Sequence, residues 1–346
     1  MNPIPHNRLL HGEEEVLAVS EVVRSGQWAG NPVIESTEAQ FALAAGTDHA
    51  VAVGTGLGAL RLALNALEIG AGEAVAVPGY SCVALANAVL ACGAQPIPVE
   101  IDRQSLNMCP KALTEMVRVH RPRMRAAIVV HTFGCPANMD QLAEAGVPLI
   151  EDCSHAFGRS DLGRRGRVAI MSLYATKLVG AGEGGMVLTS DAGIMARIRS
   201  ERDYTDQAPS SGRLNDKPSS FTAAIAGCQL KKLPEHLARR DHLADRYHSA
   251  FAGLAEKGLC RLPVKVAGRV WYRYTVDLPG NIDEVISAMS LRGVATARPV
   301  EPWGHPAGDA CADAFSRTLS LPMYPALSDD EQDRVIHAFL TSIASQ

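Results

Sequence analysis

The stretch HAVAVGTGLGALRLALNALEIGAGEAVAVP, which runs from His49 to Pro78, has the pattern of a strand, a glycine-rich turn, a helix and a second strand. Its first residues, His49–Val53, form a short apolar run that is typical of a strand. Leucines then recur at positions 57, 60, 64 and 67, which lie on one face of a helix. Glycines at positions 70 and 72 end this helix, and Ala74–Val77 is a second apolar run. The stretch therefore predicts a β-α-β unit.

The alternation of apolar runs and helical stretches continues toward the C-terminus. Further strands are expected at residues 95–99, 126–131, 148–151 and 186–189, and further helices at 82–92, 139–145 and 191–200. Strands and helices that alternate in this way build an α/β fold, in which helices cover both faces of a mostly parallel, mixed sheet. Ligands of such folds bind at the carboxyl ends of the strands, so the residues that follow each strand are candidates for a functional site.

The C-terminal part of the chain predicts a smaller α+β unit. A polar loop at 204–220 precedes a long helix at 222–255. The segments expected after it are a strand at 270–278, a helix at 282–291, an extended stretch near 294–300, and helices at 309–318 and 328–341. We therefore expect a large domain over residues 1–240 and a small C-terminal domain over residues 241–346.

The composition excludes several classes of protein. The chain has 33 Lys and Arg against 37 Asp and Glu, a net charge of −4, without the basic stripe of a nucleic-acid-binding protein. It has no run of about 20 apolar residues to span a membrane, and residues 1–15 lack the apolar core of a secretory signal. The eight cysteines include no CxxC pair, which disfavours structural zinc and dithiol redox sites. These features predict a cytoplasmic protein with reduced thiols.

The turn Gly54–Gly58, between the first strand and the first helix, is a candidate phosphate site. Glycines let a ligand approach the backbone, and a helix N-terminus offers free N–H groups and the positive end of a dipole. A dinucleotide-binding turn is an alternative, but Ala59 stands where that pattern has its last glycine. A tight turn without a ligand is the third interpretation.

Two later segments carry an acid and a lysine. Asp152 and His155 follow an apolar run, where a carboxylate either faces the ligand crevice or caps a helix. Lys177 lies between Ser172 and the glycine-rich turn Gly180–Gly185, which is typical of a lysine whose amine reacts with an aldehyde in a pocket. A phosphate cradle, an anion and such a lysine are what pyridoxal 5'-phosphate (PLP) needs at its phosphate, its pyridine nitrogen and its aldehyde carbon.

On these residues the chain resembles the DegT/StrS sugar aminotransferase family, a branch of the fold type I PLP enzymes. The resemblance extends over about residues 28–340. The matching stretches are Gly54–Leu64, VPGYSCVALANAVLACGAQPIPVEID at 77–102, IEDCSHAFG at 150–158, SLYATKLVGAGEGGMVLTSD at 172–191 and LSLPMYP at 319–325. The resemblance implies a PLP-dependent aminotransferase. Such an enzyme moves an amino group from an amino acid, expected to be glutamate, to a keto-sugar, expected to be nucleotide-linked, in sugar, polysaccharide or antibiotic biosynthesis.

The resemblance also implies a role for each matching residue. Lys177 would form the Schiff base with PLP and move the proton between the donor's Cα and the cofactor. Asp152 would pair with the pyridine nitrogen, and His155 matches a family position near the ring hydroxyl that holds Gln or His. The phosphate would be bound by the hydroxyl of Ser172 and by the residues of the glycine turn, namely Gly56, Leu57 and Gly58.

Asn215 implies that two chains share each site. It matches the family's asparagine that reaches the phosphate of the neighbouring subunit, so the resemblance implies a homodimer. The aromatic residue that usually stacks on the cofactor ring aligns with Cys82, and Tyr80 is a nearby residue that could take its place. Two further departures are Leu57, in place of the family's usual Thr, and Lys217, in place of its Arg.

The substrate and the competing functions stay open at this point. Candidate substrate contacts are Arg298, Trp303 and His305, and the cations available to a diphosphate are Arg202, Arg213, Lys217 and Arg240. A free cyclitol or an antibiotic precursor fits the residues as well as a nucleotide-linked sugar does. The alternative functions are a sugar dehydratase of the same family, which carries His in place of the lysine, a non-catalytic PLP-binding regulatory protein, and an NAD-dependent oxidoreductase.

Overall fold

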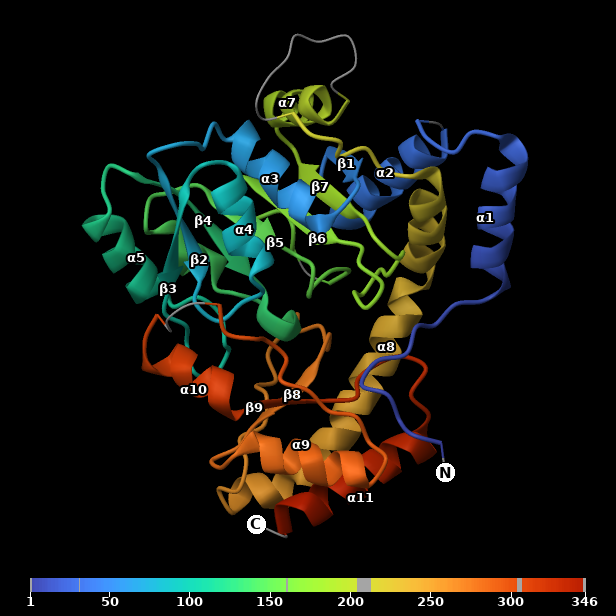
Figure 1. Ribbon diagram of the computed structural model, residues 1–346, viewed down its shortest axis with the longest axis vertical. Coiled ribbons are helices and arrows are strands. Elements are labelled where there is room, and N and C mark those ends of the chain that lie inside the picture. The colour runs from blue at the N-terminus through green and yellow to red at the C-terminus, as the bar shows by residue number, and fades with distance from the viewer. Residues whose placement is uncertain (1, 31, 160, 204–212, 304–306, 345–346) are drawn as a thin grey trace.

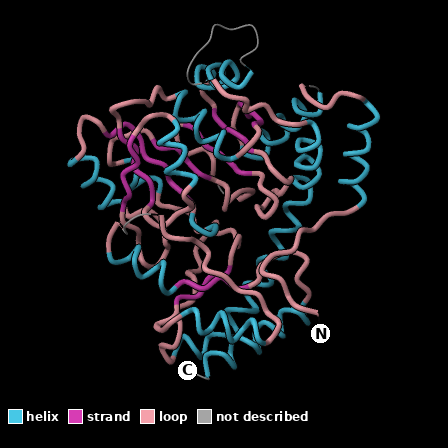
Figure 2. The backbone as a smooth tube through the Cα atoms, in the orientation of Figure 1, coloured by secondary structure: helices cyan, strands magenta, loops and turns pink. Residues whose placement is uncertain are grey.

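Two sheets organise the computed structural model, which describes residues 2–30, 32–159, 161–203, 213–303 and 307–344. The larger sheet has seven strands and lies in the upper part of Figure 1, and a two-stranded sheet lies below it in the C-terminal part. In Figure 2 the strands of the larger sheet run side by side in the middle of that upper part, with helices around them.

The seven-stranded sheet has the order β1-β7-β6-β5-β4-β2-β3. β7 runs antiparallel to both of its neighbours, and the other strand pairs are parallel. This arrangement confirms the mostly parallel, mixed sheet predicted from the sequence. The strands are β1 (His49–Val53), β2 (Ala74–Pro78), β3 (Gln95–Val99), β4 (Met124–Val130), β5 (Leu149–Asp152), β6 (Val168–Ser172) and β7 (Gly185–Thr189).

Two layers of helices bury the faces of this sheet, because side chains alternate between the faces along each strand. Val51 and Val53 of β1 pack toward α3 (Gly56–Ala66), in a cluster that also takes in α4 (Ala84–Ala91) and α7 (Ala192–Asp203). Ala50 and Ala52 of the same strand pack on the opposite face. The helices of that opposite face are α2 (Pro32–Ala45), α5 (Pro110–Val119), α6 (Met139–Ala143) and the first half of α8 (Ser220–Glu256).

The C-terminal part has a hydrophobic cluster of its own. β8 (Tyr274–Asp277) pairs antiparallel with β9 (Thr318–Leu321), and the cluster joins them to α9 (Ile282–Leu291), α11 (Asp329–Ala344) and the second half of α8. α10 (Asp309–Arg317) leads into β9, and α1 (Glu13–Ser25) packs along the outside of α8 (Figure 1). Within the described residues, no helix combines the length and apolarity needed to cross a membrane, although α8 has 37 residues.

The helix α8 belongs to both parts of the molecule. The boundary expected near residue 240 falls inside it, so one continuous helix connects the two hydrophobic cores. The division into domains 1–240 and 241–346 therefore stays a prediction. Of the polar loop expected at 204–220, residues 204–212 lie outside the described residues, and 213–219 contain no helix or strand.

The structure differs from the sequence-based expectation at several elements. The strand expected at 270–278 is shorter, because β8 begins at Tyr274 and the carbonyls of Trp271 and Tyr272 accept hydrogen bonds from Arg240 instead of from a strand. The extended stretch near 294–300 forms only isolated bridges at Val294 and Ala297. The sequence patterns do not predict α1, α2, α5, the short 3-10 helix η1 (Thr132–Gly134), β6 or β9.

Candidate active site

The carboxyl ends of β1, β5 and β6 meet at one edge of the large sheet. Asp152 ends β5 and Ser172 ends β6, and the register pairs Asp152 with Ile170, two residues before Ser172. Since β7 runs antiparallel to β6, the connection 173–184 leaves and returns at this same edge. That connection carries Lys177, so the strand order alone brings the lysine to the ends of the acid-bearing strand and the serine-bearing strand.

Backbone hydrogen bonds hold the lysine on a tight turn. The N–H of Ala175 donates to the carbonyl of Gly182 at 2.8 Å, and the N–H of Lys177 donates to the carbonyl of Tyr174 at 2.8 Å. At Gly180 the backbone approaches so closely that a Cβ atom would lie 2.2 Å from the carbonyl oxygen of Ala175. The glycines of this segment therefore allow a compact turn that fixes the position of the lysine backbone.

The glycine turn and Ser172 lie against each other. A Cβ atom on Gly56 would lie 2.7 Å from the Cβ of Ser172. Thr55 caps α3 by accepting a hydrogen bond from the N–H of Gly58 at 2.9 Å, and the N–H of Ser172 donates to the hydroxyl of Ser154 at 2.8 Å. The structure thus brings together a helix N-terminus, a glycine backbone and a serine hydroxyl, which are the groups that a phosphate binds.

A carboxylate of the chain already stands at the N-terminus of α3. Asp216 is buried and forms an ion pair with Arg61 of that helix, and its Oδ1 lies 2.5 Å from the place of a Cβ on Gly58. Its neighbour Asn215 is exposed. An anion at this position is what the dipole of α3 favours, so the turn is electrostatically suited to a negatively charged group.

Lys177 contacts a histidine that is stacked between aromatic rings. Its Nζ lies 2.9 Å from Nε2 of His155. The His155 ring stacks on Tyr272, with centroids 4.4 Å apart and an interplanar angle of 12°, and on Phe133 at 5.9 Å and 21°. Burial, together with the positive charges of Lys177 and Arg273, lowers the pKa of His155 well below its usual value. The imidazole is therefore neutral and can accept a hydrogen bond from the lysine.

The two adjacent acids of β5 have different surroundings. Asp152 is buried, and its Oδ1 accepts a hydrogen bond from the N–H of Ser154 at 2.9 Å. Glu151 accepts from Nε2 of His131 at 2.9 Å and from the backbone N–H of Gly163 at 2.7 Å, with further backbone donors at 165 and 166. Burial acts to raise the pKa of Glu151, but these hydrogen bonds hold it below its ordinary value. Glu151 thus anchors a loop, and Asp152 is the acid available to a ligand.

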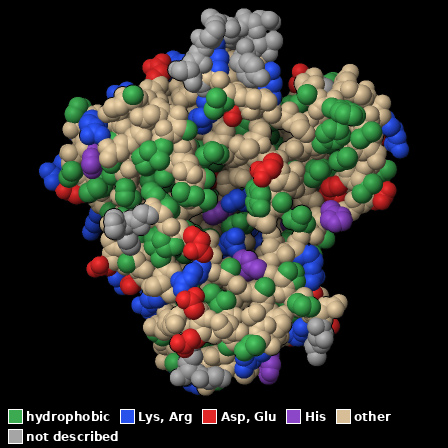
Figure 3. Space-filling view, in the orientation of Figure 1, with side chains coloured by type: hydrophobic (Ala, Val, Ile, Leu, Met, Phe, Trp, Pro, Cys, Tyr) green, Lys and Arg blue, Asp and Glu red, His purple; other side chains and the backbone are tan. Residues whose placement is uncertain are grey.

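Lys177 lines a cavity of about 290 Å³, called here the lysine cavity. It lies between the N-terminal segment 7–11, the turn 175–182 and α8. Figure 3 shows a hollow near the middle of this face, with Lys or Arg and His side chains gathered in it. The polar side chains that line the lysine cavity are Asn7, Arg8, His11, Glu15, Thr176, Lys177, Gln229, His236 and Arg240.

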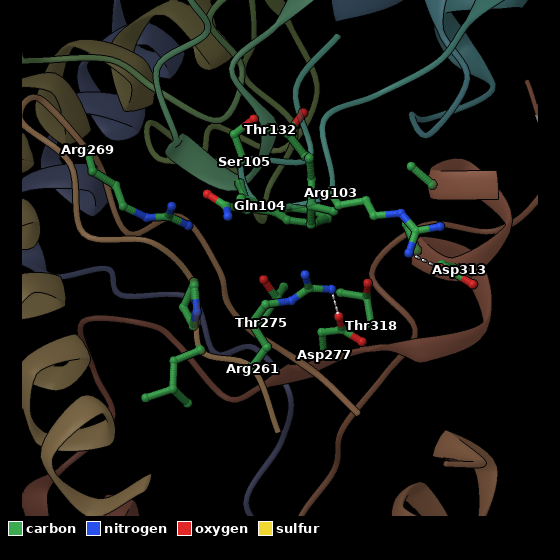
Figure 4. Close-up of a pocket in the computed structure, with 16 residues that line it drawn as sticks. Arg103, Gln104, Ser105, Thr132, Arg261, Arg269, Thr275, Asp277, Asp313 and Thr318 are labelled. Carbon is green, nitrogen blue, oxygen red and sulfur yellow. Dashed lines mark hydrogen bonds and ion pairs between the residues drawn. The ribbon is translucent and has the colours of Figure 1, made fainter. Parts of the chain in front are cut away.

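A second cavity, of about 40 Å³, lies between the large sheet and the C-terminal part (Figure 4). Two of its arginines already have acidic partners, since Arg261 pairs with Asp277, and Arg103 pairs with Asp313 at 2.9 Å. It shares no lining residue with the lysine cavity. We therefore assign the reactive centre to the edge that carries Lys177.

The two residues expected to stack on a cofactor ring do not line the lysine cavity. Tyr80 is buried between Phe133, at a centroid distance of 6.2 Å, and Phe315, at 4.9 Å, and burial raises its pKa. Cys82 is exposed, as is the side chain of Leu57. Neither Tyr80 nor Cys82 lines the lysine cavity, so their role toward a cofactor ring stays a prediction.

Most of the candidate substrate contacts are engaged in the protein itself. Arg202 pairs with Glu38 at 2.7 Å, and Arg298 pairs with Asp283 at 2.8 Å. Trp303 packs against the cluster around α3 and α4, Lys217 is exposed, and His305 lies outside the described residues. Arg240 is the member of the set that lines the lysine cavity.

Two residues near Lys177 were not identified from the sequence. Tyr272 stacks on His155, and Arg273 affects the pKa of that histidine. The available signal was an arginine inside the aromatic run Trp271-Tyr272-Arg273-Tyr274, an unusual place for a cation. The pattern of this run predicts only a strand.

The residues at this edge fit PLP. Nδ1 of His155, beside the lysine, is buried with no hydrogen-bond partner among the described residues, as expected where a polar ligand binds. Ser172 and Gly56 form a cradle, Asp152 offers a carboxylate and Lys177 offers an amine. This donor set matches the phosphate, the ring nitrogen and the aldehyde of the cofactor.

Comparisons with known proteins agree with this geometry. The model of the DegT/DnrJ/EryC1/StrS aminotransferase family matches residues 10–340. A dTDP-3-amino-3,4,6-trideoxy-alpha-D-glucose transaminase of Streptomyces venezuelae is 36% identical, in a match that covers 93% of this chain and 90% of that protein.

Solved structures resemble the chain as well. The crystal structure of S. venezuelae DesV in complex with a ketimine intermediate is 33% identical, with a TM-score of 0.85 over 95% of this chain and 94% of that one. NtdA from Bacillus subtilis, with bound cofactor PMP, is 25% identical, with a TM-score of 0.91 over 99% of this chain and 85% of that one. The similarity therefore extends over both sheets.

Proposed function

This chain belongs to the DegT/DnrJ/EryC1/StrS aminotransferase family, and we propose that it transfers an amino group from glutamate to a nucleotide-linked keto-sugar. It is a sugar aminotransferase with PLP as its cofactor. The dehydrogenase alternative is therefore wrong. The dehydratase alternative also loses its support, because the reactive position holds Lys177 and the relatives are transaminases.

One observation carries the proposed chemistry: the Lys177 amine lies 2.9 Å from a neutral histidine, at the edge where Asp152 and Ser172 end their strands. When bound, PLP supplies an electron sink for the bond that breaks at the donor's Cα. Nζ of Lys177 would act as the base that takes the proton from that Cα and, once protonated, as the acid that gives it up toward the cofactor. Asp152 keeps the ring nitrogen protonated, because an adjacent negative charge favours the protonated form.

His155 orients the lysine in this scheme. A neutral imidazole accepts a hydrogen bond from Nζ without repelling it, whereas an imidazolium would disfavour the charged amine. The stacking of His155 on Tyr272 fixes the plane of the imidazole, so the hydrogen bond has one direction. Ser172 and the backbone of Gly56, Leu57 and Gly58 would hold the phosphate.

The nucleotide-linked acceptor is inferred from the relative in S. venezuelae, which acts on a dTDP-linked sugar according to its name. Arg240, a buried arginine that lines the lysine cavity and forms no ion pair among the described residues, supports an anionic substrate. A thermal-shift panel of dTDP-, UDP- and GDP-sugars and of free cyclitols against the pyridoxamine form would identify the class that binds, because a bound ligand raises the unfolding temperature.

We also propose that the enzyme works as a homodimer in which Asn215 reaches the partner's phosphate site. The exposure of Asn215, at the end of the segment before α8, supports this proposal. The cytoplasmic location expected from the sequence stays a prediction.

The first half-reaction tests the proposed function directly. The purified holoenzyme is mixed with glutamate, and the formation of 2-oxoglutarate and the change in cofactor absorbance are followed. The wild type should release one 2-oxoglutarate per active site, and Lys177→Ala should release none while its circular dichroism stays unchanged. Borohydride reduction and peptide mass spectrometry should place a pyridoxyl group on Lys177. Normal turnover by Lys177→Ala, or a label on another lysine, would contradict the proposal.

A further inference from the structure

Three positive side chains surround one tyrosine beside the reactive lysine. The Nζ of Lys177 and the Cζ of Arg273 each lie 5.2 Å from the centre of the Tyr272 ring. Arg240 donates hydrogen bonds from Nη1 to the carbonyls of Trp271 at 3.1 Å and of Tyr272 at 3.0 Å. Lys177, Arg240 and Arg273 therefore form a positive cluster around Tyr272.

No carboxylate neutralises this cluster in the part of the chain that the structure describes. Lys177, Arg240 and Arg273 form no ion pair there within 4.0 Å. Glu15, the acid that lines the lysine cavity, is already paired with Lys232 at 2.9 Å. Because charges held away from water are stable only when they are paired, an uncompensated positive cluster in a cavity indicates an anionic ligand.

Arg240 is held by the protein itself. It is buried, and its Nη1 donates to a third carbonyl, that of Met323, at 2.9 Å. These bonds fix the backbone that leads into Arg273, so Arg240 positions the segment and contributes a fixed charge. Burial lowers its pKa to about 10, which still leaves it protonated at neutral pH.

Arg273, by contrast, has only a weak partner among the described residues. Its Nη1 lies 3.3 Å from Nε2 of His6, which also lies 2.9 Å from the hydroxyl of Ser320. Burial, and then the charge of Arg273, lowers the pKa of His6 to about 4, so this imidazole is neutral and leaves the guanidinium charge uncompensated. The planar fork of donors remains suited to a bidentate carboxylate.

A small cavity lies in front of the guanidinium. It measures about 70 Å³ and is called here the Arg273 cavity. Its polar lining comes from His6, Asn7, Thr176, Arg273 and Ser320, with the ring of Tyr272 as a wall. It shares Asn7 and Thr176 with the lysine cavity, so the two cavities adjoin directly beside Lys177.

We propose that Arg273 binds a carboxylate of the amino donor in the Arg273 cavity; this inference rests on the transaminase function proposed above. The donor's α-carboxylate is attached to the carbon whose amine reacts at Lys177, so its binding group must lie close to that lysine. A diphosphate is bulkier than a carboxylate, and in a nucleotide-linked sugar it is separated from the reacting carbon by atoms of the sugar ring. The size of the cavity and the shared contact with Tyr272 therefore favour the donor.

Binding of an unreactive dicarboxylate tests this assignment without turnover. Glutarate has the carboxylates of glutamate but no amino group, and glutaramide is its neutral analogue. Isothermal titration calorimetry of the holoenzyme should show glutarate binding and no glutaramide binding. Arg273→Leu should weaken glutarate binding by about tenfold or more, because a charge-assisted hydrogen-bond pair is lost. The glutarate affinity of Arg273→Lys should lie between those of the wild type and Arg273→Leu, because lysine keeps the positive charge but not the planar fork of donors.

Arg261→Leu is the matched control. It removes an arginine of the same C-terminal part, one that pairs with Asp277 and lies outside both cavities beside Lys177. Its affinity for glutarate should stay within about twofold of the wild type. Thermal unfolding of every variant checks folding, and Arg273→Lys keeps the test valid if Arg273→Leu does not fold.

The two half-reactions separate the possible roles of Arg273. In the donor half-reaction, Arg273→Leu should raise the glutamate concentration that gives half of the maximal rate. In the acceptor half-reaction, the half-saturating acceptor concentration should equal that of the wild type. The inference would be overturned if Arg273→Leu kept the glutarate affinity of the wild type, or if the wild type did not bind glutarate. It would also be overturned if Arg273→Leu weakened only the binding of the acceptor. A wild type that cannot convert glutamate at all would instead contradict the proposed function. Failure of the Arg273 proposal and failure of the proposed function are therefore distinguishable.

Discussion

The Nζ atom of Lys177 lies 2.9 Å from the Nε2 atom of His155, across the gap between the connections that follow β6 and β5. Burial and the charges of Lys177 and Arg273 lower the pKa of the histidine, so it is neutral and acts as an acceptor. The amine of Lys177 thus has a hydrogen-bond acceptor held beside it by the protein. The pair couples the orientation of the amine to the stack formed by His155 and Tyr272.

Replacing His155 should separate the effects of the hydrogen bond and of the ring. His155→Leu removes the acceptor, and we expect the rate of the glutamate half-reaction to fall about tenfold. A loss of this size corresponds to the free energy of one hydrogen bond to a charged group. His155→Gln keeps an acceptor and should stay within about threefold of the wild type. Stopped-flow absorbance measures both rates, and circular dichroism controls for folding. Equal losses in the two variants would show that the ring stack, and not the hydrogen bond, is what matters.

Replacing Gly56 should damage the phosphate cradle. The Cβ of Gly56→Ala would lie 2.7 Å from that of Ser172, so the turn or the end of β6 must move. We expect the dissociation constant for PLP, measured by absorbance or fluorescence titration of the apoenzyme, to rise at least about tenfold.

Gly253→Ala is the control for this substitution. Gly253 lies in α8 with no atom within 4 Å of its Cβ position, so alanine should leave PLP affinity unchanged and stabilise the helix by about 0.5–1 kcal/mol. Equal PLP affinity in the wild type and in Gly56→Ala would argue that the phosphate binds elsewhere.

The anchoring role of Glu151 predicts a pH-dependent loss of stability. Glu151→Gln replaces an acceptor of several hydrogen bonds by a group whose NH₂ faces backbone donors, and should lower the free energy of unfolding by about 2 kcal/mol at pH 7. Hydrogen bonds hold the folded-state pKa of Glu151 below its ordinary value. The contribution of Glu151 to the free energy of unfolding is therefore fully present above the pKa of an unfolded glutamate. It disappears as the pH falls through the lower folded-state pKa.

Urea unfolding at a series of pH values measures this effect. The difference between the wild type and Glu151→Gln should narrow below about pH 4. Glu35→Gln, at an exposed position of α2, is the matched control and should change stability by less than about 0.5 kcal/mol at any pH. A difference that is constant from neutral to acid pH would show that packing, and not the carboxylate charge, is responsible.

Complementation between inactive chains tests the shared site. In a verified heterodimer of a Lys177→Ala chain and an Asn215→Ala chain, one site has both intact residues if Asn215 acts on the partner. We expect this mixture to regain up to about half of the wild-type activity per dimer, as the pairing of intact residues dictates. The control mixes the Lys177→Ala/Asn215→Ala double variant with the wild type, which leaves no intact site under the same scheme. Recovery in the control but not in the first mixture would place Asn215 in its own chain's site.

The linear order of residues was enough to predict most strands of the large sheet, although not β6 in its interior. The runs at 50–53 and 74–77 are apolar on both faces, which happens when helices cover a parallel sheet on both sides. The position of Lys177 between a serine and a glycine-rich turn was also informative, because a turn that needs glycines leaves a local trace. The apolar run before Asp152 was a further local sign of a site, whereas the strand that ends at Ser172 had none and only the strand order brings the two residues to one edge.

Long-range packing decided the rest. The sequence gives no local sign that β7 is antiparallel, yet that reversal places the connection 173–184 at the edge where β5 and β6 end. Tyr272 and Arg273 reach Lys177 from a segment far along the chain, and Arg240 fixes that segment by taking carbonyl groups that a regular strand would have paired. Whether an arginine has an acidic partner depends on such contacts, which is why the positive cluster beside the lysine is visible only once the chain is folded.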